Sequence, residues 1–329
     1  TAGCTVSMTM AKSVWATFYQ VYTVSLTKLG TGSGTVTSTP AGISCGATCG
    51  AEYRSGTFVT LTATPALGTT FAGWSGACTG TAGCTLSMTA AKSVTATFTL
   101  RAYMLSVAKL GTGSGTVTSV PDGISCGTDC SEIYTYNTPV TLTATPASGS
   151  IFAGWSGACT GTAGCTVSLT AAKSVWATFY QVYPVTVTKA GTGSGTVTST
   201  PAGINCGVTC GAHYRSGTFV TLTATPALGT TFAGWSGACT GTAGCTLSMT
   251  AAKSVTATFT LRAYMLSVAK LGTGSGTVTS VPDGISCGTD CSEIYTYNTP
   301  VTLTATPASG SIFAGWSGAC TGTAGCTVS

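Results

Sequence analysis

The chain has 329 residues, carries a formal net charge of +5, and has charged side chains at only 6% of its positions. Lysine and arginine form no cluster along the sequence, which argues against nucleic-acid binding. No stretch approaches the roughly 18 apolar residues of a membrane-spanning helix, so no membrane span is expected.

One sequence recurs in tandem along the chain. The motif FAGWSGACTGTAGC occupies residues 71–84, 152–165, 232–245 and 313–326, and GTGSGTVTS occupies 30–38, 111–119, 191–199 and 272–280. The spacing alternates between 81 and 80 residues, so the repeating unit is a pair of modules 161 residues long. Such a repeat is typical of modular arrays, and it argues against a single active site.

The repeat predicts the domain organisation. Residues 22–102 and 183–263 form modules of one type, here called type A, and residues 103–182 and 264–329 form modules of type B, the last of them truncated. Residues 1–21 correspond to the C-terminal part of a preceding module. We therefore expect a continuous polypeptide that runs past both ends, with Cys4 bonded to a cysteine upstream.

Residues 22–102 show the strand pattern of one module in chain order. Alternating apolar and polar residues predict strands at 23–27 and 35–38, joined as a hairpin by the glycine-rich turn at 30–34. Further strands are predicted at 51–54, 58–64, 71–74, 85–89 and 94–98. No window has a convincing helical period, so the predicted fold is all-β, a small antiparallel β-sandwich or barrel-like sheet.

Cysteine supplies two short-range pairs to each module, with C-x3-C and C-x5-C spacing. The pairs are Cys45/Cys49, Cys78/Cys84, Cys126/Cys130, Cys159/Cys165, Cys206/Cys210, Cys239/Cys245, Cys287/Cys291 and Cys320/Cys326. Disulfides are favoured over zinc, because the only histidine, His213, aligns with Glu52 and belongs to no repeated ligand set. Each disulfide would stabilise its module by roughly 2 kcal/mol. Such pairing predicts an extracellular or cell-surface location.

The order of the motifs resembles that of a known family. GTGSGTVTS, PxGIxCGxxC, VTLTATP, FAGWSGACxxxxxC and AAKSVTATF follow one another as in the divergent InlB B-repeat family, and the resemblance covers the whole chain. It implies tandem modules of a bacterial secreted or surface protein, with a β-grasp-like fold. It implies no catalytic residue.

The tryptophans fall into two groups. Those of the FAGW motif would stack on sugar rings if exposed, but the neighbouring Phe71 and Cys78 favour a place in a small core; they are Trp74, Trp155, Trp235 and Trp316. Trp15 and Trp176 occur only at alternate module ends, where Thr95 and Thr256 stand in the other type. That placement predicts an inter-module or inter-chain contact.

Three weaker patterns each have a plainer explanation. Carboxylates cluster in the type B modules and would suit Ca²⁺, although a solvated loop is favoured; they are Asp122, Asp129 and Glu132, with Asp283, Asp290 and Glu293 in the copy. The GTGSG segments resemble phosphate-binding loops but lie between strands rather than before a helix. Threonine pairs such as Thr60 and Thr62 resemble ice-binding faces, yet strand propensity explains them equally well. No metal, cofactor or catalytic residue is therefore predicted.

The whole pattern predicts a structural, non-enzymatic array that builds an extracellular bacterial fibre, filament or surface stalk. Its expected partner is itself, either as a continuation of the same array or as neighbouring chains. The alternative is an adhesin or carbohydrate-binding array with a glycan ligand on the repeated tryptophans. Strands of about eight residues span roughly 26 Å, so each module should advance the chain by about 25–45 Å.

Overall fold

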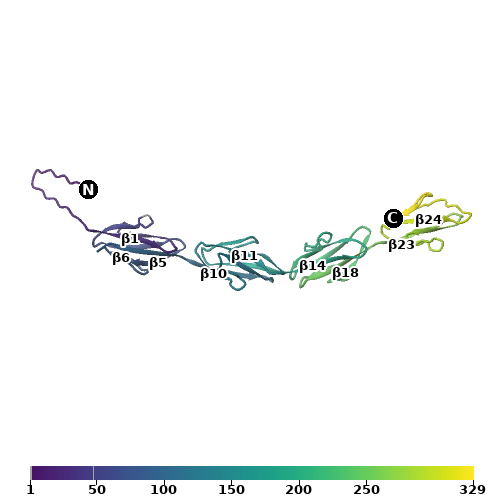
Figure 1. Cartoon of the computed structure of the whole chain (residues 1–329), viewed down its shortest axis with the longest axis horizontal. Coiled ribbons are helices and arrows are strands. Elements are labelled where there is room, and N and C mark those ends of the chain that lie inside the picture. Colours follow the sequence, from purple (N-terminus) through teal and green to yellow (C-terminus); the bar gives the residue numbers. More distant parts are fainter. Residues whose placement is uncertain (1, 47) are drawn as a thin grey trace. The chain divides into compact units, whose positions relative to one another are not determined.

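The computed structural model describes residues 2–46 and 48–329, and the regular elements within them are all β-strands. This confirms the all-β prediction. The chain divides into two compact units, one made of residues 1–110, 115–146 and 152–179 and the other of 111–114, 147–151 and 180–329. Each repeat has its own cluster of buried apolar side chains, and Figure 1 shows each repeat as its own group of strands.

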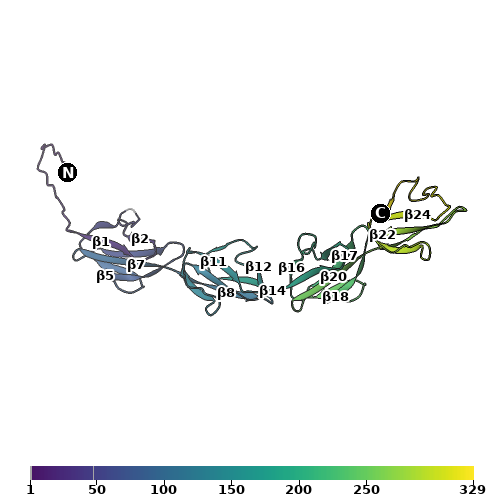
Figure 2. The ribbon, with the colours of Figure 1, turned by 45° about the vertical axis from the view of Figure 1, so that its right-hand side comes forward.

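The first repeat folds into two sheets that share one core. Its strands are β1 (Val21–Leu29), β2 (Gly34–Thr39), β3 (Gly50–Arg54), β4 (Phe58–Pro65), β5 (Thr69–Gly76), β6 (Cys84–Ser87) and β7 (Lys92–Leu100). One sheet has the order β3-β1-β7-β5 and the other the order β2-β4-β6. Both sheets contribute side chains to a single buried cluster, which makes the repeat a β-sandwich (Figure 2).

The alternation of the sequence explains which side of each strand is buried. In β4, Val59 and Leu61 are buried, whereas Phe58 and Thr60 beside them face solvent. The threonines of β2 and β4 lie opposite one another on the outer face, and Thr60 shares a hydrogen bond with Thr85 of β6. Threonine suits this face because it favours strands and its hydroxyl remains in water.

The later repeats follow the same plan. The second repeat contains β8 (Ala102–Leu110), β9 (Gly115–Val120), β10 (Ser131–Thr135), β11 (Pro139–Pro146), β12 (Ser150–Gly157) and β13 (Cys165–Ser168). A single strand, β14 (Lys173–Ala190), ends the second repeat and begins the third. The third and fourth repeats contain β15 (Gly195–Thr200), β16 (Gly211–Arg215), β17 (Phe219–Pro226), β18 (Thr230–Gly237), β19 (Cys245–Ser248), β20 (Lys253–Leu261), β21 (Ala263–Ser267), β22 (Gly276–Val281), β23 (Ser292–Thr296), β24 (Val301–Pro307) and β25 (Cys326–Val328).

Two strand pairings differ from the sequence prediction. The predicted hairpin of β1 and β2 is wrong, because β1 pairs with β3 and β7 while β2 pairs with β4 in the other sheet. The glycine-rich segment at 30–34 therefore crosses between the sheets, and the Gly32 N–H donates to the Phe98 carbonyl at 3.0 Å. The sheets are also not wholly antiparallel, since β1 and β7 run parallel. Alternation predicts that a strand exists but does not predict its partner.

The two ends of the chain differ from the middle. Residues 2–20 contain no strand, and Trp15 and Phe18 in this segment are 86% and 91% exposed. The fourth repeat has a smaller buried cluster than the first three, and its Trp316 packs against that cluster only partly buried. Cys4 is exposed and has no disulfide partner in the described part of the chain.

Candidate functional site

The C-x3-C disulfide ties the two sheets of a repeat together. In the first repeat Cys45 is fully buried and bonded to Cys49. The Cys45 N–H donates to the Val36 carbonyl of β2 at 2.7 Å, and the Cys49 carbonyl accepts from the Leu26 N–H of β1 at 2.8 Å. Since β1 and β2 belong to different sheets, this short covalent loop links the backbones of both.

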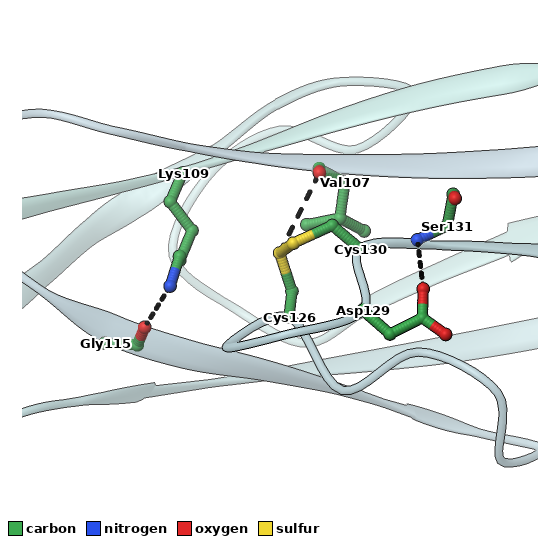
Figure 3. The surroundings of a disulfide bond; sticks show 7 residues. All are labelled: Val107, Lys109, Gly115, Cys126, Asp129, Cys130 and Ser131. Atoms are coloured by element: carbon green, nitrogen blue, oxygen red, sulfur yellow. Dashed lines mark hydrogen bonds between the residues drawn. A yellow bond between two sulfur atoms is a disulfide. The ribbon is translucent and has the colours of Figure 1, made fainter.

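Figure 3 shows the same link in the second repeat, around Cys126 and Cys130. The Cys126 Sγ lies 3.9 Å from the Val107 carbonyl, a contact rather than a hydrogen bond because a disulfide sulfur carries no hydrogen. Beside it, Asp129 accepts a hydrogen bond from the Ser131 N–H, and Lys109 donates to the Gly115 carbonyl at 3.0 Å. The Asp129 carboxylate thus accepts a hydrogen bond from its own loop.

The C-x5-C disulfide makes a second link between the sheets. Cys84 lies in β6 of the three-stranded sheet, whereas Cys78 follows Ala77, whose N–H donates to the Ser93 carbonyl of β7. The same bond recurs from Ala158 to Ser174 and from Ala238 to Ser254. The first three repeats therefore each carry two disulfide-closed loops that connect their sheets, and the C-x3-C loop does so through backbone hydrogen bonds.

All eight cysteine pairs form as the sequence predicts. They are Cys45–Cys49, Cys78–Cys84, Cys126–Cys130, Cys159–Cys165, Cys206–Cys210, Cys239–Cys245, Cys287–Cys291 and Cys320–Cys326. Each pair joins cysteines four or six positions apart, so every disulfide lies within its own repeat.

The surroundings of Cys291 differ from those expected of a complete repeat. The Cys287 N–H donates to the Val278 carbonyl of β22 at 2.7 Å, as in the other repeats, and the Cys291 carbonyl accepts from the Val268 N–H at 2.8 Å. Val268, however, lies one position beyond the end of β21, and β21 pairs only with β23. The positions equivalent to β5 form no strand here, and those equivalent to β7 fall after residue 329. Cys291 thus ties the three-stranded sheet β22-β24-β25 to the two-stranded sheet β21-β23.

The tryptophan of the FAGW motif supports the second disulfide loop. Trp74 is 6% exposed, its ring meets Phe71 edge-on, and its indole N–H donates to the Ala82 carbonyl at 3.0 Å. Its counterparts Trp155 and Trp235 are buried to the same degree. The predicted core position is confirmed for these three, so none of them offers a ring face for a sugar.

Type A and type B repeats meet through a compact set of hydrogen bonds around Arg101. The Arg101 N–H donates to the Gly68 carbonyl at 2.9 Å, the Arg101 carbonyl accepts from the Tyr136 N–H at 2.7 Å, and the guanidinium donates to the Thr69 carbonyl. Gly68 has a φ of +72°, and a Cβ there would overlap the Tyr136 ring. The same contacts recur between the third and fourth repeats, at Arg262, Gly229, Tyr297 and Thr230.

The opposite junction, from type B to type A, uses different side chains. The Val182 N–H donates to the Gly149 carbonyl and the Ser216 N–H to the Gln181 carbonyl, both at 2.8 Å. The guanidinium of Arg215 lies over the Tyr180 ring, 4.3 Å from its centroid. Neither junction was predicted from the sequence, although the module types differ at the positions concerned: Arg101 corresponds to Val182, and Tyr180 corresponds to Thr99.

The remaining residues singled out from the sequence lie outside the disulfide loops. Trp15 lies exposed in the strandless segment, while Trp176 lies in β14, 38% exposed, with its indole against Gly157 of the same repeat. Glu132 accepts a hydrogen bond from the Ile133 N–H in its own strand. Among residues 2–46 and 48–329, no group of three metal-ligating side chains comes together and no helix is long and apolar enough to cross a membrane.

A family comparison accounts for all four repeats. The family model described as the divergent InlB B-repeat domain matches residues 24–102, 105–182, 183–263 and 266–329. The chain belongs to this family. The B-repeats of this chain thus share one seven-stranded pattern, in full or in part, and each contains two local disulfides. Of the curated proteins compared with the chain, none matches it.

Several solved structures resemble the B-repeat chain in part. The Bacillus anthracis TIE protein aligns at 9% identity over 74% of this chain and 51% of its own, with a TM-score of 0.35. The minor pilin GBS52 of Streptococcus agalactiae aligns at 6% identity over 52% of this chain and 99% of its own, with a TM-score of 0.20. The pilus adhesin SpaC of Lactobacillus rhamnosus GG aligns at 10% identity over 77% and 44%, with a TM-score of 0.26. The chain spans about half the length of the TIE protein.

Proposed function

We propose that this chain is a structural part of an extracellular bacterial fibre, filament or surface stalk, with no catalytic role. The observation that carries the proposal is the repetition of one β-sandwich in which two disulfides join the two sheets. Membership of the B-repeat family supports a surface protein. Disulfides persist in oxidising compartments, which supports an extracellular location.

The proposal includes the module bounds and the partner. We assign the modules to residues 22–102, 103–182, 183–263 and 264–329, with residues 1–21 as the end of a preceding module. The expected partner is the same array, as a continuation or as a neighbouring chain. Alternating junctions support this, because each module type meets the next through its own set of hydrogen bonds.

The adhesin alternative loses its main support. A glycan-binding array would need the repeated tryptophans at the surface, but Trp74, Trp155 and Trp235 are buried. A structural role needs no such surface. It is supported by buried tryptophans that hold a disulfide loop through a hydrogen bond, as Trp74 does.

Antibody labelling of the producing bacterium tests the proposal. Gold-conjugated antibody raised against the native chain should decorate intact, unpermeabilised cells along thin surface fibres seen by electron microscopy. Label that appears only after permeabilisation would refute the extracellular location, and label confined to one tip of a different fibre would favour an adhesin.

A further inference from the structure

We propose that the fourth repeat of one copy binds residues 12–20 of a second copy as an added strand, so that copies of this chain join head to tail. The inference rests on the proposed function, because it specifies how neighbouring arrays meet. Residues that follow Ser329 in a continuous polypeptide are the rival occupant of the same place.

The receiving site is an apolar groove in the fourth repeat, with a volume of about 700 Å³. Its lining includes Leu266, Val268, Val278, Phe313 and Trp316. Leu266 and Val268 are only partly buried, whereas their counterparts Leu105 and Val107 in the second repeat are 0% and 5% exposed. The groove therefore opens a core that the second repeat buries.

One strand fills the equivalent place in the second repeat. Val175, Ala177 and Phe179 of β14 are fully buried there, and β14 pairs with both β8 and β12. The Phe179 ring occupies the space beside Gly115, where a Cβ would overlap it. At the equivalent Gly276 the nearest atoms belong to the backbone and not to a ring. The fourth repeat thus has a slot shaped for the phenylalanine of such a strand.

The segments beside the groove also lack the pairing that β14 provides. In the second repeat β8 extends to Leu110, but in the fourth β21 ends at Ser267. Residues 311–318, equivalent to β12, form no strand. Both differences adjoin the place of β14, so an added strand would restore both pairings, as in other cases of strand addition to an exposed sheet edge.

The chain itself contains a strand sequence that fits this groove. Residues 11–22 and 172–183 are identical, AKSVWATFYQVY, so Val14, Ala16 and Phe18 correspond to the three buried side chains of β14. They lie in the N-terminal segment that contains no strand, and Val14 and Phe18 are 63% and 91% exposed. These apolar side chains would be buried by docking.

The register of the added strand follows from the same identity. In the second repeat residues 173–178 pair in parallel with residues 105–110. Residues 12–17 and 266–271 repeat these two sequences without a difference. The docked strand can therefore adopt the same parallel register against the fourth repeat.

Trp15 has a place in this arrangement. Trp176 of β14 lies against Gly157, whereas the equivalent Gly318 has open space at its Cβ position. A docked strand would carry Trp15 over Gly318. The exposed indole would then make the inter-chain contact that the sequence predicts.

The junction that follows the docked strand is already partly formed in the first repeat. The Arg54 guanidinium lies over the Tyr19 ring, 4.0 Å from its centroid, and the Ser55 N–H donates to the Gln20 carbonyl at 2.8 Å. The same two contacts follow the buried part of β14. The end of the donor segment is thus held in advance, which lowers the entropic cost of binding.

The strand and the groove belong to different repeats, so the contact is heterologous. Each pair of copies keeps one free strand and one free groove, and the contact therefore propagates into open chains. It also preserves the alternation of module types, because a type B repeat receives the strand that leads into a type A repeat.

Sedimentation velocity of the 329-residue chain tests this inference, with Cys4 alkylated so that no disulfide links the copies. Val14→Glu and Phe18→Glu place a carboxylate on side chains that would enter the groove. Ser13→Glu is the matched control, because its counterpart Ser174 faces outward in β14. We expect the unmodified chain and the control to form dimers and longer species as concentration rises. Both inward variants should associate at least tenfold more weakly, because the groove offers a buried carboxylate no partner.

Hydrogen exchange reports on the groove independently. The peptides 150–157 and 311–318 have one sequence, but only the first forms a strand. The monomer should therefore give a slow and a fast population of the same peptide mass. Association should remove the fast population in the Ser13→Glu control but not in Phe18→Glu.

Four results would overturn the inference. They are an unmodified chain that remains monomeric at all concentrations, undiminished association of both inward variants, an equal loss in the Ser13→Glu control, and native material whose intact mass shows a polypeptide that supplies this strand after Ser329. None of them bears on surface labelling of the bacterium. A monomeric chain that still labels surface fibres would reject strand addition and leave the structural role intact.

Discussion

At the scale of single residues, the FAGW tryptophan has a clear structural task. Trp74 fills the core beside Phe71 and holds the disulfide loop through its bond to the Ala82 carbonyl. The motif made this predictable, because an aromatic residue just before a cysteine pair suits a core packed on a disulfide. The position of Trp176, outside that core, was visible only as an alternation between module types.

Trp74→Ala should destabilise the first repeat by about 3–5 kcal/mol, because it removes a large buried side chain and its hydrogen bond. Trp176→Ala, at a partly exposed position, should cost much less. Hydrogen exchange of the peptide that spans each substitution measures this locally, since the substitution gives that peptide a unique mass. Equal protection in the two variants would contradict the assigned core role.

At the scale of elements, the sequence predicted the strands better than their pairing. The strands around Val59 and Leu61 lie where alternation places them, because one buried face imposes a period of two. The pairing of β1 with β7 joins segments almost seventy residues apart and depends on the packing of two sheets. No local pattern encodes such a contact. The glycine-rich segment between β1 and β2 has the sequence of a hairpin turn, although these two strands do not pair.

The cysteine pairs were predictable for the opposite reason. Their partners lie four or six positions apart, so spacing alone identifies them, including Cys291 and Cys326 of the fourth repeat. What each disulfide links was not predictable, because that depends on which sheets the neighbouring backbone joins. The Cys49 and Cys291 carbonyls make the same kind of hydrogen bond, yet only the first reaches a strand of a four-stranded sheet.

Removal of the first disulfide by Cys45→Ala with Cys49→Ala should weaken the link between the sheets by roughly 2 kcal/mol. The Leu26 amide, which donates to the Cys49 carbonyl, should then exchange about 30-fold faster. The peptide 21–29 reports this, because its sequence differs from that of 182–190. The matched variant Cys206→Ala with Cys210→Ala should leave the peptide 21–29 unchanged, and an unchanged rate in the first variant would contradict the inter-sheet role.

At the scale of the whole molecule, the junctions are what the sequence analysis missed. The module bounds and the alternation of module types were predicted, but the Arg101 and Arg215 contacts were not. The reason is physical: Gly68, Arg101 and Tyr136 are far apart in the sequence and meet only after two modules have folded. Each junction is also too small to show as a motif.

Gly68→Ala should loosen the junction of the first and second repeats, because alanine disfavours a positive φ and its Cβ would displace the Tyr136 ring. Limited trypsin digestion should then cut after Arg101 at least tenfold faster. Gly56→Ala is the control, since Gly56 has a similar φ of +78° and open space around its Cβ position. Equal cleavage after Arg101 in the two variants would contradict a specific role for the contact between Gly68 and Tyr136.

Electron cryo-microscopy of the native assembly tests most directly whether these repeats build a fibre. We predict continuous fibres of successive β-sandwiches in which module types alternate, with a true axial period of two modules, about 50–90 Å. Averaged density should distinguish type B by the bulky Trp176 on its outer sheet, where type A has threonine. Isolated globular particles, or fibres in which this chain forms no part of the shaft, would contradict the structural role.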